Sequence, residues 1–209
     1  MDLFTEIADE RRRAADLLAT LTDEQLAVQS LCSAWSVHEV AAHLVTPLEV
    51  GIPSFALAML ASRGDFDRAN LRLTSRQARR PVGEIVAILR QKADSRFTPP
   101  GAGPEAPLTD LLVHGLDIRW PLGLTSDVPE RRTRTSLTFL TSRSARGLVP
   151  RGALDGLRFS ADDVDWTHGS GPLVTGAADA LLLALTGRTA ALAHLGGDGL
   201  PTLQTRLPG

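Results

Sequence analysis

The chain has a single cysteine, no long apolar run and no large excess of charge of one sign. Cys32 is the only cysteine among 209 residues, which excludes an internal disulfide and is typical of a protein of a reducing cytoplasm. No apolar run approaches the ~20 residues of a membrane span. The N-terminus also lacks the basic and apolar segments of a signal peptide. We therefore expect a soluble, cytoplasmic protein without a membrane partner.

Lysine is almost absent as well, and arginine carries the positive charge. Lys92 is the only lysine, while Lys and Arg together number 22 against 24 Asp and Glu, giving a net charge of −2. The arginine runs at 11–13 and 131–132 have acidic neighbours. Because nucleic-acid binding depends on an excess of positive charge, the sequence does not predict a nucleic-acid partner.

The spacing of apolar residues predicts helices through most of the chain. Residues 67–80 are strongly charged and predict either a solvated helix or a long ordered loop. Long helices with such connections favour an up-and-down helical bundle over residues 1–147. The remaining helices are predicted at 2–20, 22–29, 36–64 with a kink at Pro47, 81–96, 108 to about Pro121, and 127–147.

After Pro150 the pattern changes to short alternating segments. Residues 157–160 and 164–167 predict a hairpin, 173–175 a third strand and 202–205 a last strand. An apolar helix is expected at 177–185, and a short one at 190–194. Residues 148–209 thus predict a small α+β domain. The whole chain is predicted to have an α+β fold, with the helical bundle in its N-terminal part.

Three ionisable side chains interrupt an apolar helical segment near the middle of the chain. Asp110 and His114 are four residues apart, so both project from one face of a helix, about one turn apart. This is the spacing of two ligands to one metal ion. Asp117 follows on the same stripe, where its carboxylate could hydrogen-bond and orient the His114 imidazole.

A third ligand is available on another predicted helix. Ser36 and Glu39 form a capping box that begins this helix near Val37, which puts His43 two turns inside an apolar stretch. His38 and His43 are five residues apart, whereas the zinc-protease motif needs four, so that motif is rejected. In a bundle, His43 could meet Asp110 and His114 at the axis.

Purely structural interpretations of the same residues stay open. His43 could be a satisfied core histidine, and Asp110 could cap its own helix or pair only with His114. Cys32 could be a small buried residue or, because it precedes a helix N-terminus, a reactive thiol. Neither Glu39, which the capping box already explains, nor Arg119, which lies off the ligand stripe, is assigned a catalytic role.

Several segments resemble one known family, the mycothiol-dependent maleylpyruvate isomerases, which belong to the DinB-like metal-binding four-helix bundles. The resemblance extends into the tail, which is similar to the small C-terminal α+β domain of those proteins. The segments that carry it are 34–37, 41–44, 110–118, 121–123, 173–179 and 183–188.

The resemblance implies that His43, Asp110 and His114 bind a divalent metal ion, zinc above all, with Asp117 behind them. Asp110 stands where the family has glutamate, one methylene longer. It also implies a mycothiol-type thiol cofactor and a small electrophilic substrate such as maleylpyruvate, acted on by isomerisation or thiol transfer. The alternatives are a non-catalytic metal- or ligand-binding bundle with a stress or regulatory role, and a fold relic whose histidines are only structural.

Overall fold

Helices make up the first of the two compact units of the chain, which comprises residues 1–97 and 117–124. The computed structural model describes residues 2–99, 101–145 and 147–207. The helices of this unit are α1 (Leu3–Leu18), α2 (Asp23–Leu26), α3 (Val37–Glu49), α4 (Ile52–Ala61), α5 (Phe66–Gln77), α6 (Val82–Gln91) and η1 (Trp120–Leu122).

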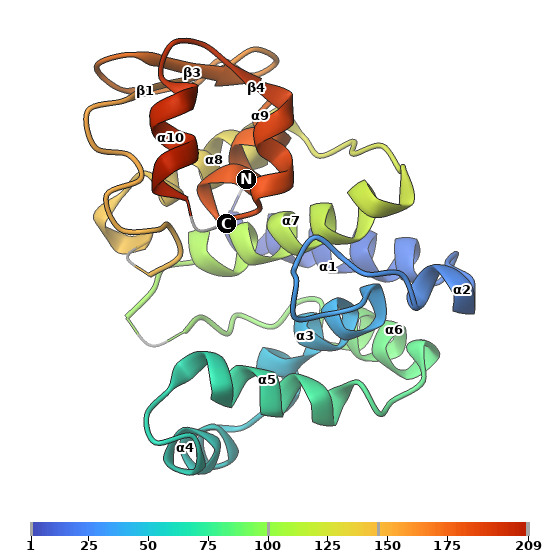
Figure 1. The fold of residues 1–209 in the computed structure, drawn as a ribbon. Coiled ribbons are helices and arrows are strands. Elements are labelled where there is room, and N and C mark those ends of the chain that lie inside the picture. The colour runs from blue at the N-terminus through green and yellow to red at the C-terminus, as the bar shows by residue number, and fades with distance from the viewer. Residues whose placement is uncertain (1, 100, 146, 208–209) are drawn as a thin grey trace. The chain divides into compact units, whose positions relative to one another are not determined.

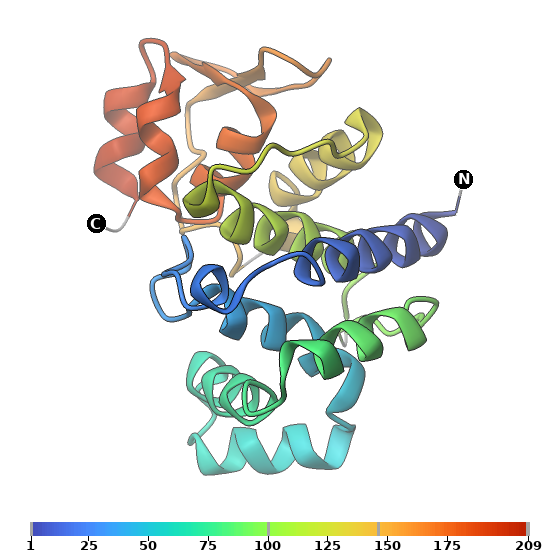
Figure 2. The ribbon, with the colours of Figure 1, turned by 90° about the vertical axis from the view of Figure 1, so that its right-hand side faces the viewer.

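Helix α3 lies at the centre of this unit, because it packs against both α5 and α6, and α6 in turn packs against α1. Helix α5 lies between α3 and α4, as both views show (Figure 1 and Figure 2). The core between these helices is apolar: Val40, Ala41 and Val45 on α3 are fully buried, as are Ile85 and Leu89 on α6.

Helix α4 begins anew after α3, so the continuous helix predicted over 36–64 is wrong. Pro47 is accommodated inside α3, and the chain becomes extended at Val50 (ψ 109°) and Gly51 (ψ 160°). Pro53 then stands in the first turn of α4, where its fixed φ favours the start of a helix. No residue of α4 is buried, and Ile52 and Leu60 are 80% and 77% exposed.

The charged segment predicted as a helix or a loop is helical. Asp65 caps the start of α5, because its carboxylate accepts a hydrogen bond from the Arg68 N–H at 2.9 Å. Ala69, Leu73 and Thr74 form its buried face. Only a narrow face of this helix is buried, so charged residues dominate its sequence and its apolar periodicity is weak.

Helix α7 (Glu105–Arg119) is unbroken, although its last turn belongs to the first unit and the rest to the second. The second unit comprises residues 98–116 and 125–209. Its other elements are α8 (Glu130–Leu140), η2 (Arg143–Ala145), β1 (Arg158–Ala161), β2 (Thr167–Gly169), β3 (Leu173–Gly176), α9 (Ala178–Leu185), η3 (Thr189–His194), β4 (Leu195–Gly196) and α10 (Leu200–Arg206).

The strands of the second unit form a sheet in the order β2-β1-β3-β4. Strands β1 and β2 pair antiparallel as predicted, with Phe159 opposite His168, but β2 shares only Thr167 with the predicted strand 164–167. Strands β1 and β3 run parallel. Helices α9 and α10 extend from the same side of the sheet (Figure 1). Helices together with this small C-terminal sheet confirm the predicted α+β class.

Two predicted elements at the ends of this unit are wrong. The strand predicted at 202–205 is part of α10, where Pro201 in the first turn favours a helix start and outweighs the strand preference of the threonines. The helix predicted to reach Gly147 ends at Leu140, and a short 3₁₀ turn follows.

The compact units do not follow the domain boundary predicted after residue 147, since α8 packs against α9 within the second unit. The division into a helical domain 1–147 and an α+β domain 148–209 remains a prediction. Among the described residues, no helix has both the length and the apolar character needed to cross a membrane.

Candidate metal centre

His43 is held on α3 by contacts from two other parts of the first unit. The residue is 9% exposed, and its ring stacks on Trp35, with 4.6 Å between the ring centroids and 25° between the ring planes. Its Nδ1 lies 3.4 Å from the Thr74 hydroxyl of α5. The ring therefore contacts one residue from the loop just before α3 and one from α5, which is 31 residues away in the sequence.

The capping box predicted at the start of α3 is confirmed. The Ser36 N–H donates to Glu39 Oε2 at 2.9 Å, and the Glu39 N–H donates to Ser36 Oγ at 3.3 Å. Because the Glu39 carboxylate accepts the hydrogen bond of the cap, the cap accounts for this residue and no catalytic role needs to be assigned to it. The box sets the first turn of α3 and so places His43 two turns further along.

The loop before α3 fixes Trp35 by hydrogen bonds to its backbone carbonyl. This oxygen accepts from the Ser30 hydroxyl at 2.6 Å and from the Gln29 amide at 2.8 Å. In the same loop, the Leu31 N–H donates to the Asp117 carbonyl oxygen at 3.2 Å. The last turn of α7 is thus attached to the loop that positions Trp35.

Asp110 and His114 lie one turn apart on α7, as predicted, and their side chains meet. His114 Nε2 is 3.5 Å from Asp110 Oδ1, and the side chains are 10% and 40% exposed. Because α7 begins at Glu105, Asp110 lies in the second turn and does not cap the helix. All residues of α7 from 111 to 118 are buried, so the His114 imidazole lies in a buried stretch of the helix, while the Asp110 carboxylate keeps contact with solvent.

Asp117 is fully buried on the same helix, three residues after His114. Its carbonyl oxygen accepts the hydrogen bond from Leu31 described above. The predicted role of its carboxylate, which is to orient the His114 ring, remains a prediction.

The other residues considered in the sequence have different surroundings. His38 is partly buried, and its Nε2 lies within hydrogen-bond distance of the Ala78 carbonyl oxygen, at 3.0 Å. Cys32 is half-buried. His168 is half-buried and stacks near Trp166 with ring centroids 6.3 Å apart, and His194 is exposed.

The contacts of Trp35 and Thr74 with His43 were not predicted. Thr74 belongs to the charged segment 67–80, in which arginines dominate the pattern. The signal that could have revealed it is the spacing of Ala69, Leu73 and Thr74, which marks one face of a helix. His43, Asp110 and His114 together are side chains of a kind and number that could hold a metal ion.

Comparison with known families gives one match by sequence. The model of the mycothiol maleylpyruvate isomerase N-terminal domain matches residues 7–119, more than half of the chain. The chain belongs to this family. The matched segment includes the whole of α3, α5 and α7, and so contains all of the predicted metal ligands.

Solved structures agree with this assignment at the level of the fold. Two are similar: the mycothiol-dependent maleylpyruvate isomerase and a mutant of it in which one histidine is replaced by alanine, each with a TM-score of 0.53 and 14% identity. Each alignment covers 95% of this chain and 96% of the other. No curated protein sequence matches the chain.

Proposed function

We propose that this protein is a divalent-metal-dependent enzyme that uses a mycothiol-type thiol to isomerise a small electrophile such as maleylpyruvate, or to transfer the thiol to it. Membership of the family supports the thiol and the substrate class, since the similar solved proteins are named mycothiol-dependent maleylpyruvate isomerases. The metal is supported by the geometry of α7.

The distance between Asp110 and His114 carries this proposal. At 3.5 Å, the Nε2 and Oδ1 atoms are too far apart for a good hydrogen bond, which is typically about 2.9 Å long. Two ligands of a tetrahedral zinc ion, each bonded at about 2.0 to 2.1 Å, are about 3.3 Å apart. The pair therefore has the spacing of one edge of a zinc site, and the carboxylate and imidazole are ligands that zinc accepts.

We assign His43 as the third ligand. Thr74 engages its Nδ1, so we assign the Nε2 atom to the ion. Contacts within the first unit support this assignment. The His43 ring stacks on Trp35, and the loop that contains Trp35 is hydrogen-bonded through Leu31 to Asp117. Asp117 is one helical turn from His114 on the unbroken α7.

Three protein ligands leave a coordination position for an exogenous ligand. A divalent ion there would lower the pKa of a thiol and favour its nucleophilic thiolate form. The chain's own part would be to hold the ion between two buried imidazoles, His43 and His114, and the half-exposed carboxylate of Asp110. In the isomerisation, the thiolate sulfur would add to an electron-poor double bond, and the electron pair of that bond would move to the conjugated carbonyl oxygen. The former double bond, now a carbon–carbon single bond, would rotate, and loss of the thiolate would form the double bond again in the other geometry.

Metal analysis of protein purified without chelators tests the ligand set. We expect about one equivalent of zinc in the wild type and a loss of most of it in His43→Ala, Asp110→Ala and His114→Ala. The matched control is His38→Ala, which removes another α3 histidine and should keep its metal. Less than about a tenth of an equivalent in the wild type would contradict the metal proposal.

Thiol-dependent conversion of maleylpyruvate, followed by chromatography, tests the reaction. We expect turnover with mycothiol and not with glutathione, and its loss in His43→Ala but not in His38→Ala. A rise in melting temperature with mycothiol would report binding independently of turnover, because a ligand of the folded state stabilises it. Metal without any thiol binding would favour the non-catalytic metal-binding alternative.

A further inference from the structure

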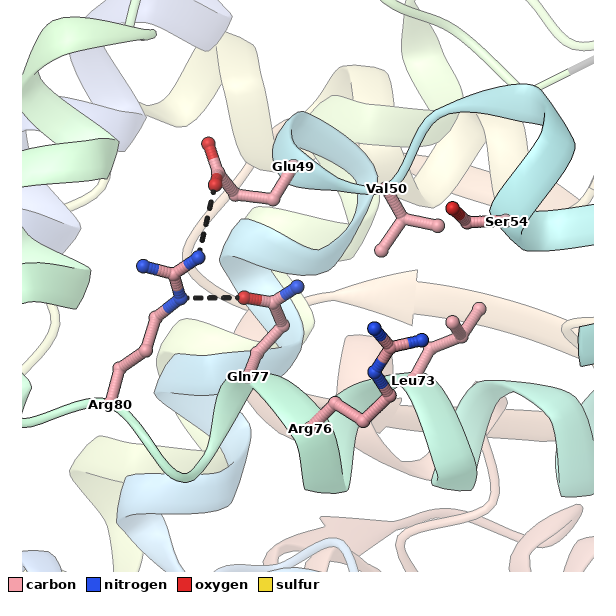
Figure 3. Close-up of a pocket in the computed structure, with 7 residues that line it drawn as sticks. All are labelled: Glu49, Val50, Ser54, Leu73, Arg76, Gln77 and Arg80. Carbon is pink, nitrogen blue, oxygen red and sulfur yellow. Dashed lines mark hydrogen bonds and ion pairs between the residues drawn. The ribbon is translucent and has the colours of Figure 1, made fainter.

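A polar cavity lies in the first unit, where the end of α3, the start of α4 and the second half of α5 meet (Figure 3). Its volume is about 210 Å³. None of the proposed metal ligands lines it. The lining residues are Glu49, Val50, Ser54, Leu73, Arg76, Gln77 and Arg80.

The carboxylate of the cavity, Glu49, is already neutralised. Its Oε1 lies 2.6 Å from Lys92 Nζ, and its Oε2 lies 3.3 Å from an Arg80 guanidinium nitrogen. A second guanidinium nitrogen of Arg80 lies 3.3 Å from Glu84. Two carboxylates and two cations therefore form a balanced group, which adds no net charge to the cavity.

Arg80 also determines which end of the Gln77 amide faces the cavity. The Arg80 Nε–H donates to Gln77 Oε1 at 2.9 Å, so the amide oxygen is occupied. The amide nitrogen is on the opposite side and points between Val50 and Arg76 (Figure 3). Gln77 thus offers hydrogen-bond donors to the cavity.

Arg76 brings a positive charge without a counter-charge. Among the described residues, no carboxylate pairs with its guanidinium, which lies over α5 next to Leu73 and below Val50 and Ser54 (Figure 3). Ser54 adds a hydroxyl from the first turn of α4. The cavity therefore combines one uncompensated cation and further donors with two apolar side chains, Val50 and Leu73.

We propose that this cavity binds a small monocarboxylate with a short apolar chain. Arg76 provides one positive charge, which matches one carboxylate and not a dianion, and the Gln77 amide can donate to the second carboxylate oxygen. Val50 and Leu73 would contact the apolar part. A water molecule occupies about 30 Å³ in the liquid, so the volume suits a ligand of about five to seven non-hydrogen atoms. This site is separate from the proposed metal centre.

Titration of ¹⁵N-labelled protein with sodium butyrate, at constant ionic strength set with chloride, tests the proposal. We expect a saturable shift of the Gln77 side-chain amide signals, with a Kd on the order of 1 mM because Arg76 is exposed. Arg76→Gln should weaken binding about tenfold, and Arg76→Lys should retain part of it. His43→Ala should bind butyrate as the wild type does, which separates this site from the metal centre.

Arg72→Gln is the matched control, because Arg72 is an exposed arginine one turn earlier on α5 that does not line the cavity. An equal loss of binding in Arg72→Gln would show general charge attraction and overturn the proposal. No saturable shift of Gln77 up to about 50 mM butyrate would also overturn it. Saturable binding of inorganic phosphate without binding of butyrate would overturn the assignment of a monocarboxylate.

Discussion

Removal of the Thr74 hydroxyl should loosen His43 without disturbing the packing around it. Thr74 is fully buried, and its Oγ1 lies 3.4 Å from His43 Nδ1. Valine has nearly the same volume and shape, so Thr74→Val creates no cavity and removes only the polar contact. The net value of one such hydrogen bond is about 1 kcal/mol. Because 3.4 Å is long for a hydrogen bond, we expect a loss of unfolding free energy at or below that value.

The effect on metal affinity should be larger than this cost in stability suggests. If His43 binds the ion through Nε2, its Nδ1 carries the proton and donates to the Thr74 oxygen. Loss of such an orienting partner typically lowers metal affinity by about 10- to 100-fold. Trp35 still stacks on the ring in the variant, so we expect about a tenfold loss, at the lower end of this range.

Two measurements separate the effect of Thr74→Val on stability from its effect on zinc affinity. Urea unfolding of chelator-treated protein gives the stability, and competition with a chromophoric chelator gives the zinc affinity. The matched control is Thr46→Val, because Thr46 is buried on α3 and its hydroxyl donates to the Ala42 carbonyl at 2.9 Å rather than to the ring. Thr74→Ser should restore most of the affinity. An unchanged zinc affinity in Thr74→Val, or an equal decrease in Thr46→Val, would refute the role of Thr74.

Three further predictions concern the fold. Leu18→Ala should cost about 2 to 5 kcal/mol in urea unfolding because Leu18 is fully buried, whereas Leu60→Ala, at a site 77% exposed, should change it by less than about 0.5 kcal/mol. Ser36→Ala removes the cap of α3 and should cost about 1 kcal/mol, and no change would argue against the cap. The hydrogen bond from the Thr22 hydroxyl lowers the pKa of Glu24 below its ordinary 4.5. This stabilisation is therefore present above that value and is lost as the pH falls through the lowered pKa. Side-chain NMR titration should show the lowered pKa, and Thr22→Val should move it back up.

The features predicted best are those that are formed by residues close together in the sequence. The capping box predicted at Ser36 and Glu39 is present, because the side chains and backbone groups that form it are only three residues apart. The approach of Asp110 to His114 follows in the same way from helical spacing alone.

Contacts between distant segments could not be predicted in this way. Thr74 is 31 residues from His43, and nothing local to either residue indicates the other. The break between α3 and α4 was not predicted. Proline usually marks a helix kink or end, but Pro47 lies within α3, and the helix ends where the backbone becomes extended at Val50 and Gly51. Strand β4 consists of Leu195–Gly196 alone, which is too short to show alternation.

The two imidazoles of the proposed site therefore differ in what holds them. His114 is positioned against Asp110 by the helix that both share, so this pair persists as long as α7 is folded. His43 depends on Trp35 and on Thr74 of α5, a helix whose other face lies next to the exposed α4. Local opening of α5 would release the Nδ1 contact of His43 and leave the α7 pair intact. Substitutions along the buried face of α5 should consequently change the metal affinity through His43 alone. When the contact of His43 is lost, zinc should be bound only by Asp110 and His114, and with lower affinity.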